Sequence, residues 1–407
     1  MNKKNQKLSI RWMYMAIGVI AMLFAGVLYA WSILKHPLNI EFGWEPSKLA
    51  FNFTLAMTFF CVGGLAGAQL SGRLGHRIAL VISGILASAG FILTSILDGS
   101  SVVLLYITYG ILAGLGIGIA YNVVIATVSA WFPDKKGLSS GCLMMGFGAS
   151  ALIIGNVADA MFKSDMGWRF AYVILGVAIL VVLSLSAFLL KTPGSDIVFP
   201  EPKAAKITKE KDIEQRDFTT GQMLCRASFW MAFVCISLLA AVGSSVISFA
   251  KDMALSVNAS EGLAVSLVGV LSVCNGIGRI LTGAIFDVIG RRKTMLCANV
   301  ITICAASVTL LAVSVNSLPL CIVGLCLTGV SYGSCPTITA AFTSSFFGMK
   351  NFSNNMAIMT FTVMVGSFIA TASNKVMEAT GGYSATFIML LSLTFVALVL
   401  NSFIKKP

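Results

Sequence analysis

Twelve long apolar stretches constrain the fold of this 407-residue chain more than any other feature of its sequence. A helix of about 20 apolar residues crosses the roughly 30 Å hydrocarbon core of a bilayer. Inside that core every backbone polar group must be bonded within the protein, which favours helices over open sheets. The stretches lie at residues 12–34, 50–70, 78–97, 102–130, 138–162, 168–190, 229–250, 262–286, 294–315, 318–346, 353–376 and 384–403. The sequence therefore predicts an all-α membrane protein with twelve transmembrane helices.

Composition supports this class. Apolar residues make up 57% of the chain and charged residues only 11%, against about 25% charged residues in soluble domains. The first stretch is too long for the apolar region of a cleavable signal peptide. The ten cysteines form no CxxC pair and no cluster with histidine, so that we expect neither a metal site nor a cofactor.

The distribution of Lys and Arg predicts the orientation. With the N-terminus in the cytoplasm, most of the 28 basic residues fall in cytoplasmic segments, as the positive-inside rule requires. The net charge of +12 then follows from topology and does not indicate a nucleic-acid partner. We predict a multi-pass protein of the inner (plasma) membrane with both termini in the cytoplasm, most simply a monomer in the lipid bilayer.

One long polar segment, residues 191–226, divides the chain into two halves of six spans. We predict bundles at 1–190 and 227–407, joined by a cytoplasmic linker that includes a short surface helix before span 7.

The halves also share a loop motif, "AQLSGRLGHR" at 68–77 and "GAIFDVIGRR" at 283–292. The second copy resembles the loop signature of the major facilitator superfamily, which implies that fold, two six-helix bundles related as a parallel repeat. In the first copy Gly72 replaces the aspartate; the predicted gating motif of the second consists of Gly283, Asp287, Gly290, Arg291 and Arg292.

Arg279 is the one charged residue inside span 8. It lies eight residues from Asp287 at the predicted cytoplasmic end, hence about 12 Å inward. A charge at this depth is costly and indicates a function. No Asp or Glu of any span lies at comparable depth, so we expect the guanidinium to bind a substrate carboxylate through its two-pronged fork. Asn275 lies one helical turn away on the same face and orients the arginine or binds the substrate.

Three tyrosines, Tyr29, Tyr121 and Tyr332, lie within spans 1, 4 and 10. A tyrosine hydroxyl donates to a carboxylate while its ring closes an apolar pocket, so we predict all three at the substrate site. Gly333 and Pro336 are expected to loosen span 10 beside Tyr332. No nucleophile–base pair and no pair of carboxylates shares a depth, which argues against an enzyme.

Further motifs resemble the oxalate/formate antiporter family of this superfamily. They are "YNVVIATVSAWFPDKKGLSSG" at 121–141, "GVLYAW" in span 1, "NGIGR" in span 8, "SYG..P" in span 10 and "KNF" before span 11. The resemblance covers nearly the whole chain. It implies a secondary transporter of small organic anions that works by alternating access, with the monocarboxylate transporters as wider kin.

Two departures from these relatives narrow the expectation. Oxalate-transporting members carry a lysine in span 11 where this chain has Met359. A site with one cation suits a substrate with one carboxylate, because a second carboxylate would lose its hydration without gaining a partner. We therefore predict a monocarboxylate such as lactate, pyruvate, glycolate, formate or acetate, with its short tail near Leu28, Met359 and Val363. The alternatives are an oxalate/formate-type exchanger and a non-transporting sensor.

The second departure concerns coupling. Animal monocarboxylate carriers have an aspartate where this chain has Asn275, and an amide carries no proton. Anion exchange, uniport and proton symport, the last through an outer group such as Asp252 or with the substrate itself, all remain open.

Overall fold

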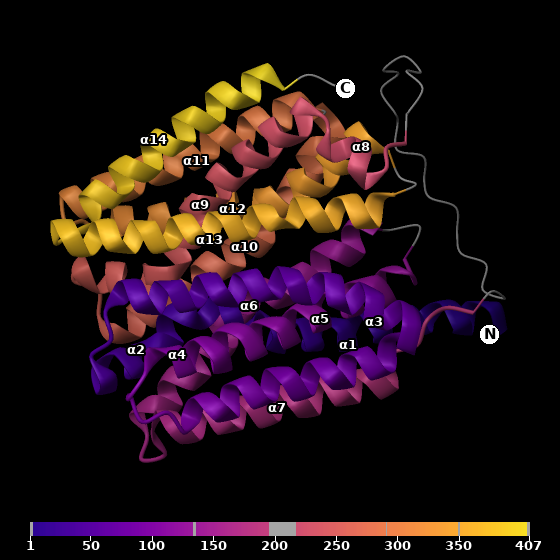
Figure 1. The fold of residues 1–407 in the computed structure, drawn as a ribbon, viewed down its shortest axis with the longest axis horizontal. Coiled ribbons are helices and arrows are strands. Elements are labelled where there is room, and N and C mark those ends of the chain that lie inside the picture. The colour runs from indigo at the N-terminus through magenta and orange to yellow at the C-terminus, as the bar shows by residue number, and fades with distance from the viewer. Residues whose placement is uncertain (1–2, 133–135, 195–216, 290, 349–350, 405–407) are drawn as a thin grey trace. The chain divides into compact units, whose positions relative to one another are not determined.

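The computed structural model describes residues 3–132, 136–194, 217–289, 291–348 and 351–404. The chain forms two compact units, Met1–Trp44 with Leu55–Ala205 and Glu45–Thr54 with Lys206–Pro407. The described residues of both units are helical, without strands (Figure 1). The division into 1–190, 191–226 and 227–407 stays a prediction, because residues 195–216 of the linker lie outside the described residues.

The first unit holds the helices expected for spans 1 to 6. Predicted span 1 comprises two α-helices separated by a 3₁₀ turn, and predicted span 4 begins with a single α-turn followed by a π-helix. Such irregular turns within helices often mark functional positions. The elements are α1 (Lys3–Ala25), η1 (Gly26–Ala30), α2 (Trp31–Phe42), α3 (Pro46–Ser95), α4 (Val102–Leu105), η2 (Tyr106–Ala113), α5 (Gly114–Ser129), α6 (Lys136–Lys163) and α7 (Gly167–Leu189).

Predicted spans 2 and 3 are continuous in α3, a 50-residue helix broken at Gly75. Gly75 has φ 83° and ψ 160°, a left-handed conformation that glycine adopts at no steric cost. It belongs to the first copy of the repeated loop motif. The sequence-predicted turn between spans 2 and 3 is therefore a sharp backbone break at a glycine, with no intervening coil.

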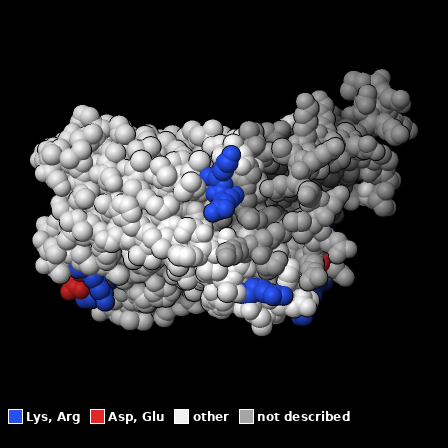
Figure 2. All heavy atoms as spheres, turned by 90° about the horizontal axis from the view of Figure 1, so that it is seen from above, with Lys and Arg blue, Asp and Glu red and all other residues white. Residues whose placement is uncertain are grey.

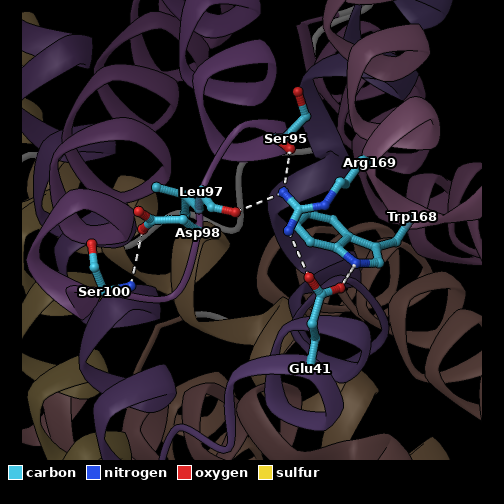
Figure 3. Close-up of polar contacts among 7 residues, drawn as sticks. All are labelled: Glu41, Ser95, Leu97, Asp98, Ser100, Trp168 and Arg169. Atoms are coloured by element: carbon cyan, nitrogen blue, oxygen red, sulfur yellow. Dashed lines mark hydrogen bonds and ion pairs between the residues drawn. The ribbon is translucent and has the colours of Figure 1, made fainter.

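A network of polar contacts joins three helices at one end of the first unit (Figure 3). Arg169, near the start of α7, pairs with Glu41 at the end of α2 at 2.6 Å and donates to the carbonyl oxygens of Ser95 and Leu97 at 2.9 and 2.6 Å. The indole of Trp168 donates to the other oxygen of Glu41. One arginine thereby ties α2, α3 and α7 together in the predicted outer loops.

The second unit holds the helices expected for spans 7 to 12. The predicted short helix before span 7 is present as α8. The long helices run side by side in Figure 1, with α10 packed on α12 and α9 on α13. The elements are α8 (Thr220–Leu224), α9 (Ala227–Ser256), α10 (Glu261–Ile289), α11 (Arg291–Ser314), α12 (Leu318–Phe347), α13 (Phe352–Thr380) and α14 (Tyr383–Phe403).

The segment before α8 is fastened to the ends of α12 and α13. The backbone N–H of Phe218 donates to the carbonyl oxygen of Phe347 at 2.9 Å. The side-chain amides of Asn351 and Asn355 both donate to the carbonyl oxygen of Phe218 at 3.1 Å. These bonds satisfy backbone groups at a helix end that would otherwise lack partners.

Eleven helices of the described part are long and apolar enough to cross a membrane. One of them is the 50-residue α3, which Gly75 divides, and this accounts for the twelve predicted spans. The helices also show apolar outer faces, and the view in Figure 2 contains few charged side chains. On α7 the exposed apolar residues recur every three or four positions, as on a lipid-facing stripe. They are Phe170, Ile174, Val177, Val181, Leu185 and Phe188.

Candidate functional site

Arg279 lies within α10, ten residues before the last residue of that helix, which corresponds to about 15 Å along the axis. Its side chain is only 5% exposed. The guanidinium Nε donates to the side-chain oxygen of Asn275 at 3.3 Å, and Asn275 is fully buried. The structure thus brings these two predicted residues together, with the amide fixing one edge of the guanidinium fork.

Close packing between α10 and α12 positions this pair. A Cβ atom at Gly333 would overlap the carbonyl oxygen of Asn275, and one at Gly278 would overlap that of Val330. Only glycine lets the two backbones approach so closely. The hydroxyl of Thr337 on α12 also donates to the carbonyl oxygen of Arg279 at 3.2 Å. The backbone that carries the arginine is therefore held against α12 along two turns.

Tyr332 lies on α12 next to Gly333 and is 1% exposed. Its ring covers Gly243 of α9, where any side chain would overlap it. Tyr332 thus packs α12 closely against α9. The predicted apolar residues of span 11 lie on α13, which packs most extensively on α9. Met359 is fully buried there, and Val363 is half-buried.

The predicted residues of the first unit gather around the 3₁₀ turn η1. Leu28 and Tyr29 belong to this turn and are buried. The ring of Tyr29 lies edge-on to that of Phe147 of α6, with 5.0 Å between the ring centroids. The ring centroid of Tyr121 of α5 lies 5.2 Å from that of Phe147. Phe60 of α3 completes the cluster at 5.0 Å from Tyr121. Two predicted tyrosines from different spans therefore lie on one shared phenylalanine.

Sequence reasoning missed Phe60 and Phe147, because a phenylalanine inside a span carries no signal that separates it from lipid-facing neighbours. It also missed the burial of Lys251. The side chain of Lys251 is fully buried near the end of α9. A basic residue beside the predicted end of a span was the available hint.

The predicted gating motif is only partly visible. Gly290 lies outside the described residues, as do the side chains of Asp287 and Arg291, whose backbones belong to α10 and α11. Arg292 is exposed, and Gly283 lies on α10 with Thr337 as its nearest neighbour. The role of this motif stays a prediction. Within the described ranges, no three His, Cys, Asp or Glu residues are grouped as metal ligands would be.

Comparisons with known proteins agree with this architecture. The sequence model of the Major Facilitator Superfamily matches residues 14–251 and 233–407. The chain is 26% identical to the oxalate:formate antiporter of Oxalobacter formigenes, over 97% of this chain and 91% of that protein. It is 25% identical to monocarboxylate transporter 12 of Homo sapiens, over 79% and 66% of the two chains. The fold matches that of the xylose transporter XylE from E. coli with a TM-score of 0.70 at 13% identity, over 98% of each chain.

Proposed function

Because this chain belongs to the major facilitator superfamily, and is thus a multi-pass membrane transporter and not an enzyme, we propose that it carries small organic anions. Its substrates are monocarboxylates such as lactate or pyruvate. They bind through the guanidinium of Arg279, and alternating access moves them across the bilayer.

The observation that carries this proposal is the burial of Arg279 deep within a transmembrane helix, eighteen residues from its first residue and ten from its last. A charged side chain costs at least about 2.5–3.5 kcal/mol at the centre of a membrane helix, and tight α10–α12 packing holds the arginine there. Asn275 occupies one edge of the guanidinium through Nε. The Nη1–Nη2 side of a guanidinium suits the two oxygens of a carboxylate. The role of Asn275 is to orient the fork.

The aromatic cluster of the first unit supplies groups suited to the rest of such a substrate. Tyr29 and Tyr121 have hydroxyls that donate hydrogen bonds and rings that exclude water. Leu28, Met359 and Val363 are apolar and favour a short apolar tail. Tyr332 combines a ring and a hydroxyl next to the α10–α12 contact.

Oxalate/formate exchange is the second candidate, favoured by the similarity to the Oxalobacter antiporter over nearly the whole chain. Against it stands Met359, which is fully buried and offers no charge to a second carboxylate. A dianion would bring an unpaired charge into a dry site, which is costly.

The test is uptake of labelled lactate into proteoliposomes, with unlabelled oxalate as competitor. We expect Arg279→Ala to abolish uptake with normal expression, because it removes the cation. Arg279→Lys keeps the charge but loses the two-pronged geometry, so it should be severely impaired as well. The exposed Lys293→Ala, which lies outside the predicted gating motif, serves as a control for loss of a positive charge near the same helix. Robust uptake by Arg279→Ala would contradict the proposal, and equal inhibition by oxalate and lactate in the wild type would favour the exchanger.

A further inference from the structure

A second basic residue of the second unit is buried as completely as Arg279. The side chain of Lys251 on α9 is 0% exposed, and its Nζ lies 3.6 Å from Oε1 of Glu261 at the start of α10. This separation exceeds a normal hydrogen bond. The glutamate side chain is 49% exposed, so it is largely hydrated while the lysine is not. The pair is therefore asymmetric, with a buried cation and an acid that can move into water.

A buried polar face leads along α9 towards this lysine. Ser244 and Ser248 lie one helical turn apart on the same side of α9, and Lys251 follows three residues after Ser248. The side-chain amide of Asn374 on α13 donates to the hydroxyl of Ser248 at 3.0 Å. All four side chains are fully buried.

Two polar atoms of this face remain unsatisfied. Neither the hydroxyl of Ser244 nor the side-chain oxygen of Asn374 has a hydrogen-bond partner among the described residues. Buried polar groups without partners are uncommon in folded proteins, and they indicate that water or a ligand completes the site. The polar face is therefore suited to an occupant with hydrogen-bonding groups.

The backbone of α9 is also broken beside Lys251. Phe249 has a non-helical conformation (φ −132°, ψ 17°), and its ring packs on Tyr383 of α14 at 5.0 Å. α9 is therefore kinked just before Lys251, beside an aromatic contact with α14. Asp252 follows Lys251 and is turned about 100° around the helix; it interacts electrostatically with Tyr383.

We propose that Lys251 is a second carboxylate-binding site, at which the substrate anion takes the place of Glu261. Glu261 gives up a long ion pair and gains full hydration, whereas the incoming carboxylate neutralises the buried ammonium directly. This inference rests on the proposed transport of organic anions and adds a separate step to it.

The two sites are too far apart to hold one small anion. Lys251 lies five residues from the end of α9, and Arg279 lies eighteen residues from the start of α10. At 1.5 Å per residue these positions differ by about 20 Å along the helix axes. In the predicted orientation Lys251 is on the outer side, so it receives the anion before Arg279 does.

The experiment measures thermal stabilisation of the purified protein by lactate and by oxalate, in a neutral detergent without anionic lipid. We expect Arg279→Ala to retain a weak, saturable stabilisation by carboxylate. The double variant Arg279→Ala/Lys251→Gln should lose it, whereas Arg279→Ala/Lys251→Arg should keep it. The matched control is Lys48→Gln in the Arg279→Ala background, because Lys48 is an exposed lysine that pairs with Glu45 at 3.2 Å. Glu261→Gln should tighten the residual binding, since it removes the competing carboxylate.

The outcomes separate this inference from the proposed function. If carboxylates stabilise the wild type but no longer stabilise Arg279→Ala, the second site is wrong and the transport proposal stands. If the double variant binds as well as Arg279→Ala, or if Glu261→Gln weakens binding, the exchange at Lys251 is wrong. If no carboxylate stabilises the wild type, both proposals fail. In uptake assays Lys251→Gln should raise KM by about tenfold, the lower end of the effect of a steering charge, with little change in kcat.

Discussion

The sequence alone predicted the depth and the hydrogen-bond partner of Arg279, but it did not predict the burial of Met359. The depth of Arg279 followed from counting residues along a helix, because the rise per residue is fixed. Its hydrogen bond to Asn275 followed from the spacing of four. The burial of Met359 depends on how α13 packs on the neighbouring helices, which no local pattern contains. Phe60, Phe147 and Lys251 were missed for the same reason: contacts between helices decide which side of a span faces the protein.

The buried position of Met359 makes it the residue at which to test charge matching. We expect Met359→Lys to weaken lactate binding and to make oxalate a stronger inhibitor of lactate uptake, because a lysine supplies a partner for a second carboxylate. Burial will also favour the neutral amine when no substrate is bound, so the gain should be larger at lower pH. The measurement is inhibition of labelled lactate uptake by unlabelled oxalate at two pH values. Met359→Gln, whose side chain has a similar length but no charge, is the matched control, and an unchanged oxalate preference in Met359→Lys would contradict the charge argument.

At the scale of helices, the sequence predicted where spans lie better than where they are irregular. Gly333 and Pro336 were expected to loosen span 10, but α12 continues through both as one helix. Gly333 instead admits the carbonyl oxygen of Asn275. The irregular turns occur in span 1 at η1, in span 4 at η2 and in span 7 at Phe249. A glycine within a span can indicate either a flexible position or close packing of two helices. The residues that lie next to the glycine in space determine which of the two applies.

The turn η1 begins at Gly26, where a Cβ atom would overlap the carbonyl oxygen of Phe147. We expect Gly26→Ala to lower the stability of the protein by about 1–3 kcal/mol, as overpacking of a well-packed site does. It should also reduce uptake, because it shifts η1 and Tyr29 away from Phe147. The control is Gly72→Ala, since nothing lies within 4 Å of a Cβ at Gly72. The measurement is the melting temperature in detergent together with lactate uptake; equal melting temperatures for the two variants would contradict the close approach.

At the scale of the whole molecule, the number of spans and the superfamily were predictable because membrane hydropathy and loop glycines are local signals. The compact units do not follow the linker alone. Residues Glu45–Thr54, the first turns of α3, belong to the second unit, where the hydroxyl of Thr54 contacts Thr371 of α13 at 2.8 Å and the backbone N–H of Ser47 donates to Glu378 at 2.6 Å. Contacts between segments 300 residues apart in sequence leave no trace in either segment by itself.

The orientation in the membrane is the remaining prediction at this scale, and it depends on the excess of Lys and Arg in the predicted cytoplasmic segments. Ser195 in the linker and Ser100 between spans 3 and 4 should lie on opposite sides of the bilayer, because three spans separate Ser100 from the N-terminus and six separate Ser195 from it. We expect Ser100→Cys, but not Ser195→Cys, to react with a membrane-impermeant maleimide added to intact cells, measured as labelling above that of the wild type with its native cysteines. After permeabilisation both should react, which shows that each thiol is accessible. Labelling of Ser195→Cys from outside intact cells would reverse the orientation, and it would place Lys251 on the cytoplasmic side, where it would meet the anion after Arg279 during uptake.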